Sequence, residues 1–251
     1  MPVASQTQVA PGAAQGSAGS PPLPRTRSEA LPSCQLVDRY AVRGKRVVEI
    51  ACGSGEFLSL LCTIGGCEGV GFDPSYVASR APRRSKGRVE VRTEHYSEAH
   101  ARIPADLICC RHALEHLDDP LEFLRMLRRG LGERRDTVLY FEVPNATWIL
   151  DEFDLWDLIY EHFAYFCRES LVHLFRRAGF QVLDAGDAFD RQFLWVEARA
   201  GRGDTPNRPD LRELERRAEA FAVACQKRVD FSDEIRTRLR ELGLPGECRA
   251  A

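Results

Sequence analysis

The sequence predicts an α/β fold, a mostly parallel sheet with helices on both faces. Short apolar runs alternate with helical segments along residues 46–142, and this alternation is typical of parallel strands joined by covering helices. The chain has 251 residues, of which 44% are hydrophobic and 29% are charged, the composition of an ordinary folded protein. We therefore expect one large domain with a buried core and appendages.

The expected strands are short apolar runs that end at turn signals. The first ends at a glycine-rich turn and the second ends at Asp73. We expect strands at residues 46–50, 68–72, 89–91, 106–110, 137–141, 180–183 and 193–198. Together they make a sheet of seven strands.

Helices are expected between and after these strands. They cover residues 57–62, a segment that starts near Asp73, residues 120–131 and residues 168–178. The third is the best marked, because Pro120 stands at its first position and Asp118 or Asp119 serves as its N-cap. Gly179 closes the last one.

Three segments depart from this alternation. Residues 1–33 hold six of the fourteen prolines and are expected to be disordered, because they bury too little apolar surface to order themselves. Residues 145–166, dense in aromatic and acidic side chains, interrupt a domain expected over residues 34–200. Residues 208–243 predict a helical tail, whose apolar heptad spacing indicates a contact with a second copy, with a further domain or with the chain's own core.

Charge and cysteine content exclude several classes of function. With 35 basic and 37 acidic residues the net charge is -2, which is not that of a general nucleic-acid binder. No apolar run reaches the about 18 residues of a membrane span. The nine cysteines are odd in number, with no secretory signal and no C-x2-C pair. We expect reduced thiols in a cytoplasmic protein, packed as small core residues and binding no metal.

The central motif is E-I-A-C-G-S-G-E-F at residues 49–57, where the first strand meets the first helix. Gly53 and Gly55 let the backbone approach a ligand closely. Asp73, twenty residues after Gly53, is placed to accept both hydroxyls of a ribose. The motif therefore predicts a nucleoside-binding site.

The residues beside the glycines indicate which nucleoside. A dinucleotide site would have a third glycine at position 58, where this chain has Leu58. Glu49, just before the glycines, would repel a pyrophosphate but can accept from an ammonium group. This combination favours a nucleoside that carries an amino-acid tail.

These residues resemble motif I of the class I S-adenosylmethionine-dependent methyltransferases, with Ala51 at the usual first glycine. Residues 111–117, R-H-A-L-E-H-L, are similar to the segment after the fourth strand of those enzymes. The resemblance implies a Rossmann-like sheet of seven strands, antiparallel only at the last strand from about Phe193. It implies S-adenosylmethionine as cofactor, bound by Glu49, Ala51, Cys52, Gly53, Gly55, Asp73, Glu94, Arg111 and His112.

Residues 159–166, I-Y-E-H-F-A-Y-F, resemble the E-H-F-x-Y-F segment of sugar C-methyltransferases. Those enzymes methylate the carbon next to a ketone on a nucleotide-linked deoxysugar. The resemblance implies His162 as the base that removes a C–H proton, with Glu161 orienting the substrate. Tyr160 or Tyr165 would donate to the enolate oxygen. A small-molecule acceptor of the keto-sugar class is therefore expected.

Three other functions stay open. Methylation of an oxygen or nitrogen on another small metabolite needs proximity more than a strong base, so loss of His162 would cost little. A non-catalytic module with this fold could pair with a partner through residues 211–242, and Ala51 in place of glycine favours it. Oxidoreduction with NAD is disfavoured by the missing third glycine.

Overall fold

A computed structural model describes residues 35–78, 88–154, 158, 161–201 and 209–241. The expected disorder of residues 1–33 lies outside the described residues, as does Tyr160. The strands are β1 (Arg46–Ile50), β2 (Glu68–Phe72), β3 (Arg88–Arg92), β4 (Leu107–Arg111), β5 (Val138–Pro144), β6 (Phe180–Ala188) and β7 (Phe193–Ala200). The helices are α2 (Glu56–Gly65), α3 (Pro120–Leu131), α4 (Ala146–Glu152), α5 (Arg168–Arg177) and α6 (Arg212–Glu241), with 3-10 turns η2 (His100–Arg102) and η3 (Leu114–His116).

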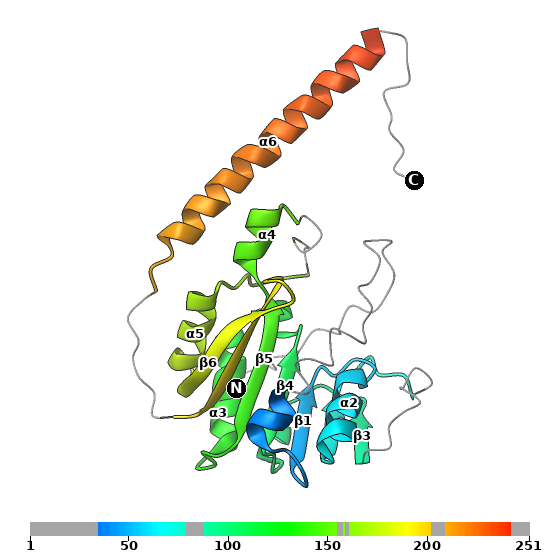
Figure 1. Ribbon diagram of the computed structural model, residues 1–251, viewed down its shortest axis with the longest axis vertical. Coiled ribbons are helices and arrows are strands. Elements are labelled where there is room, and N and C mark those ends of the chain that lie inside the picture. The colour runs from blue at the N-terminus through cyan, green and yellow to red at the C-terminus, as the bar shows by residue number, and fades with distance from the viewer. Residues whose placement is uncertain (1–34, 79–87, 155–157, 159–160, 202–208, 242–251) are drawn as a thin grey trace, which may run out of the picture.

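The seven strands form a single sheet in the order β3-β2-β1-β4-β5-β7-β6 (Figure 1). The first five are parallel, whereas β7 runs antiparallel to both β5 and β6. Ile50 lies opposite Phe72 on one side and Cys110 on the other. The carboxyl ends of β1, β2 and β4 therefore meet at one edge, and the predicted topology is confirmed.

The core has two layers because side chains alternate across the sheet. Val47 of β1 packs in the same cluster as Phe57 of α2. Val48, the next residue, packs in a second cluster with Phe123 of α3 and Phe175 of α5. Helices thus cover both faces, as predicted.

The core also contains most of the cysteines. The buried ones are Cys52, Cys62, Cys67, Cys109, Cys110 and Cys167. None of the described cysteines forms a disulfide, which agrees with the prediction that they are small core residues.

No helix begins at residues 74–75, which form a turn, and residues 79–87 of the segment in which a helix is expected lie outside the described residues. The carboxylate of Asp73 accepts from the backbone N–H of Ser75 at 2.8 Å, a side-chain turn that competes with a helical start. Asp119 is the N-cap of α3, since its carboxylate accepts from the backbone N–H of Glu122 at 2.9 Å.

Within the described residues, no helix has the length and the hydrophobicity that crossing a membrane requires.

The tail helix α6 starts beside α4 and extends beyond the sheet (Figure 1). The ring of Phe221 stacks on Phe153 with centroids 5.1 Å apart, and Arg217 pairs with Asp151 of α4. Phe221 belongs to the predicted apolar stripe, so the first part of this stripe packs on the chain's own α4.

Gly130 provides a test of the packing between α3 and η2. Glycine-to-alanine changes inside a helix usually stabilise it by about 1 kcal/mol. Here an added Cβ would lie 2.1 Å from the Cβ of Ala101, so we expect Gly130→Ala to lower the free energy of unfolding by about 1–3 kcal/mol. Urea denaturation measures the change. Adding Ala101→Gly should recover part of the loss, and a single variant as stable as the parent would contradict the packing.

Candidate active site

The loop after β1 has the left-handed backbone that its glycines predict. Gly53 has φ 54° and Gly55 has φ 77°, a region that glycine enters without steric cost. Ala51 also has a positive φ of 54°, so the residue that replaces the usual first glycine is held in a strained conformation. A Cβ added at Gly53 would meet no atom within 4 Å. The backbone of the loop is therefore open to a ligand at this point.

The structure brings Asp73 into direct contact with this loop. One carboxylate oxygen of Asp73 accepts from the backbone N–H of Gly53 at 2.8 Å. The other accepts from the backbone N–H and the hydroxyl of Ser75 at 2.8 Å and 2.6 Å. The residue is 1% exposed, yet a carboxylate offers about four acceptor positions. Three hydrogen bonds thus use all but about one of these positions, and the contact of Asp73 with a ribose stays a prediction.

A buried charged cluster around Glu142 was missed by the sequence reasoning. Glu142, at the end of β5, is fully buried and accepts from Nε and Nη2 of Arg111 at 3.1 Å and 2.9 Å. Its other oxygen accepts from the hydroxyl of Tyr140 at 2.9 Å. His112 Nε2 lies 3.0 Å from Glu142. Burial acts to raise the pKa of Glu142, but the hydrogen bond from His112 and the charge of Arg111 lower it to about 2.

Arg111, whose predicted contact with the cofactor stays a prediction, joins three elements. Its guanidinium carbon lies 4.3 Å from the ring centroid of Phe57 in α2, within the range of a cation–π contact. Burial disfavours its charge, but Glu142 and then Glu49 outweigh that effect and raise the pKa of Arg111. The arginine therefore ties β4 to β5 and to the first turn of α2.

His112 has a positive φ of 51°, which is strained for a residue other than glycine. Its ring contacts Phe193 of β7 with centroids 4.6 Å apart, and its backbone N–H donates to the carbonyl of Glu142 at 2.9 Å. The sequence signal for this cluster is an acid, Glu142, inside the apolar run of the fifth strand, whereas its position opposite Arg111 is set by the register of the strands.

Residues 161–166 fold back on η3, so the segment that resembles sugar C-methyltransferases contacts the segment at residues 111–117 that resembles class I methyltransferases. The backbone N–H groups of Phe163 and Ala164 donate to the carbonyl of Glu115 at 2.8 Å and 3.2 Å. Nδ1 of His116 lies 3.0 Å from the carbonyl oxygen of Glu161. Segments far apart in the sequence are thus held together by backbone contacts.

His162 lies at this junction. Its ring centroid is 4.8 Å from that of His116 and 5.7 Å from that of Tyr165. Tyr165 is 40% exposed, and Glu161 is half-buried. Three of the four predicted catalytic residues are therefore neighbours, and Tyr160 lies outside the described residues.

Glu94 follows β3 with its side chain half exposed, and its carboxylate lies 3.5 Å from Nε2 of His100. The neighbouring Tyr96 is buried, and its ring meets Phe72 edge-on with centroids 5.1 Å apart. The contact of Glu94 with an adenine ring stays a prediction.

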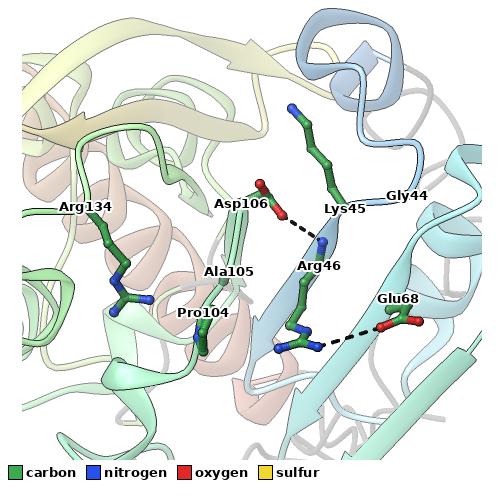
Figure 2. A pocket seen from close by; sticks show the side chains of 8 residues that line it. All are labelled: Gly44, Lys45, Arg46, Glu68, Pro104, Ala105, Asp106 and Arg134. Atoms are coloured by element: carbon green, nitrogen blue, oxygen red, sulfur yellow. Dashed lines mark hydrogen bonds and ion pairs between the residues drawn. The ribbon is translucent and has the colours of Figure 1, made fainter.

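A pocket of about 290 Å³ lies at the opposite edge of the sheet, where β1 begins (Figure 2). Its polar groups pair with one another. The backbone N–H of Arg46 donates to Asp106 at 2.9 Å, and the guanidinium of Arg46 lies 3.8 Å from Glu68 (Figure 2). Arg134 donates to the carbonyl of Ile103 at 2.8 Å. Because these polar groups are already paired within the protein, this pocket is not a candidate active site. The predicted site residues lie at the carboxyl edge of the sheet.

A family model described as a methyltransferase domain matches residues 27–185. No curated protein matches the chain.

Solved methyltransferases have a similar fold. N,N-8-amino-8-demethyl-D-riboflavin dimethyltransferase from Streptomyces davawensis is 22% identical, with a TM-score of 0.50 over 66% of this chain and 55% of that one. The chain thus matches little more than half the length of that enzyme. The 1,6-didemethyltoxoflavin-N1-methyltransferase of Burkholderia thailandensis, solved with S-adenosylhomocysteine, is 15% identical, with a TM-score of 0.51 over 69% and 79%. Magnesium protoporphyrin IX methyltransferase from Synechocystis PCC 6803, also with S-adenosylhomocysteine, is 16% identical, with a TM-score of 0.50 over 70% and 83%.

The Glu142 cluster predicts a specific acid sensitivity. The pKa of Glu142 is about 2 in the folded chain against an ordinary value of 4.5. The contribution of Glu142 to the free energy of unfolding is therefore complete above pH 4.5 and is lost as the pH falls from 4.5 towards 2. Glu142→Gln should lower the free energy of unfolding at pH 7 by about 3–5 kcal/mol, because it leaves Arg111 buried without its anion.

Urea denaturation at a series of pH values measures both effects. Glu98→Gln is the matched control, since Glu98 is half exposed and lies 3.6 Å from Arg129, where a pair contributes less than about 1 kcal/mol. Equal losses for the two variants would contradict the role of Glu142.

Proposed function

Because the chain belongs to the methyltransferase-domain family and is an S-adenosylmethionine-dependent methyltransferase, we propose that it methylates a carbon atom of a small keto-sugar. The acceptor carries a nucleotide, and the methylated carbon lies next to the ketone. The observation that carries this proposal is the packing of residues 161–166 on η3, which puts His162 beside His116 and Tyr165. A histidine is suited to remove a proton near neutral pH.

The loop after β1 and Asp73 form the cofactor half of the proposed site. S-adenosylmethionine, when bound, supplies a methyl group carried on a positively charged sulfur. Gly53 and Gly55 approach its methionine part, since the backbone at Gly53 is open. Asp73 accepts from the ribose hydroxyls while it holds the loop, and Glu49 accepts from the ammonium group. The left-handed loop and the buried acid next to it suit this molecule.

The acceptor half of the proposed site is formed by residues 161–166. His162 would accept a proton from the carbon next to the ketone. The electron pair left on that carbon would form the new bond to the methyl group, while the electron pair of the broken methyl–sulfur bond would stay on the sulfur. The hydroxyl of Tyr165 or Tyr160 donates to the developing enolate oxygen. Glu161 orients the sugar. Tyr165 and Phe163 are exposed, as groups that meet a substrate must be.

Asp73→Ala tests the cofactor half. We expect the affinity for S-adenosylmethionine to fall more than tenfold, about 1.4 kcal/mol, because the ribose loses its acceptor. Titration calorimetry measures it. Ser75→Ala is the matched control, since it removes a hydroxyl bound to Asp73 but no proposed ribose contact. Unchanged affinity in Asp73→Ala, or an equal loss in the control, would exclude the ribose contact.

His162→Ala tests the acceptor half. In deuterated water, a panel of nucleotide-linked keto-deoxysugars should exchange the C–H proton next to the ketone with the parent protein and lose this exchange with the variant. Mass spectrometry detects the exchange. S-adenosylmethionine affinity should be unchanged, and His173→Ala on α5 should behave as the parent. Exchange retained in His162→Ala would remove His162 as the base and favour methylation of an oxygen or nitrogen.

A further inference from the structure

Glu115, His116 and His162 form a cluster of side chains that bind metals. One ligand-type atom from each residue lies within 4.8 Å of the others. Glu115 is 2% exposed, and the two histidines are half-buried. A carboxylate with two imidazoles is a ligand set that suits divalent transition metals, above all Zn²⁺.

The hydrogen bonding of His116 supports this assignment independently. A carbonyl oxygen only accepts, so the contact of 3.0 Å between Nδ1 of His116 and the carbonyl of Glu161 puts the proton on Nδ1. The lone pair of the neutral ring is then on Nε2. Histidines that bind metals usually donate their other N–H to a carbonyl or carboxylate in this way.

The backbone holds the cluster together before any ligand binds. The carbonyl of Glu115 accepts from the N–H groups of Phe163 and Ala164, which fixes the segment of His162 against η3. The rings of His116 and His162 meet edge-on at 66°. Zn²⁺ binds nitrogen and oxygen ligands at about 2.0–2.2 Å, so small rotations of these side chains are enough to close the set.

We propose that Glu115, His116 and His162 bind one divalent transition-metal ion, and that the metal competes with the proton for His162. Three protein ligands leave one open position on a tetrahedral Zn²⁺ ion. The lone pair that binds a metal cannot accept a proton, so an occupied cluster blocks His162 as a base. The metal site does not depend on the proposed function. The claim that a bound metal inhibits methyl transfer by blocking His162 does rest on it.

Calorimetric titration of the full chain with Zn²⁺ tests the site. We expect one Zn²⁺-binding event in the parent protein. Its affinity should fall at least about 100-fold in His116→Ala, His162→Ala and Glu115→Gln, because loss of an outer-shell partner alone costs up to about 100-fold. His173→Ala is the control and should bind as the parent does. No binding to the parent, or unchanged binding in the variants, would overturn the proposal.

The cysteines make a second readout necessary, because thiolates also bind Zn²⁺. Co²⁺ at this site should show the visible bands of nitrogen and oxygen ligands without the near-ultraviolet charge transfer of a thiolate. A thiolate spectrum would overturn the proposal. Each variant is also titrated with S-adenosylmethionine, which verifies its fold. If the parent protein does not bind S-adenosylmethionine, the proposed function is contradicted. If it binds S-adenosylmethionine but not Zn²⁺, only the metal site is contradicted.

Discussion

Parallel pairing of β1, β2, β4 and β5 is the constraint on which the site depends. Parallel strands end at the same edge of a sheet, and ligands of open α/β sheets bind there. The register puts Ile50 opposite Phe72 and Cys110, and Arg111 opposite Glu142. The loop after β1 and Asp73 follow β1 and β2 directly, Arg111 and Glu142 lie in β4 and β5, and η3 with His116 comes soon after β4. A shift of one strand would separate them.

Two buried carboxylates hold the groups at this edge of the sheet in place. Asp73 fixes the loop through Gly53, and Glu142 fixes the end of β4 through Arg111. A charged carboxylate such as Glu142 holds a guanidinium more strongly than a neutral side chain would. The site thus combines buried acidic supports with residues 161–166, an aromatic segment that contains the half-buried His162.

Much of the fold was predictable because strands and helices leave local signals. The apolar runs located all seven strands, and spacing alone paired Gly53 with Asp73. The contact between Arg111 and Glu142 was not predictable, since it depends on the register of neighbouring strands, and the predicted cofactor contact of Arg111 stays a prediction. No helix begins directly after Asp73, because its carboxylate forms a turn with Ser75. The role of His162 as a base rests on resemblance and stays a prediction.

We propose that the carboxyl edge binds a nucleoside with an amino-acid tail and not a dinucleotide. Titration calorimetry of the full chain with S-adenosylmethionine, and with NAD in a parallel experiment, measures this preference. We expect micromolar binding of S-adenosylmethionine and no binding of NAD. Binding of NAD, or no binding of S-adenosylmethionine, would contradict it.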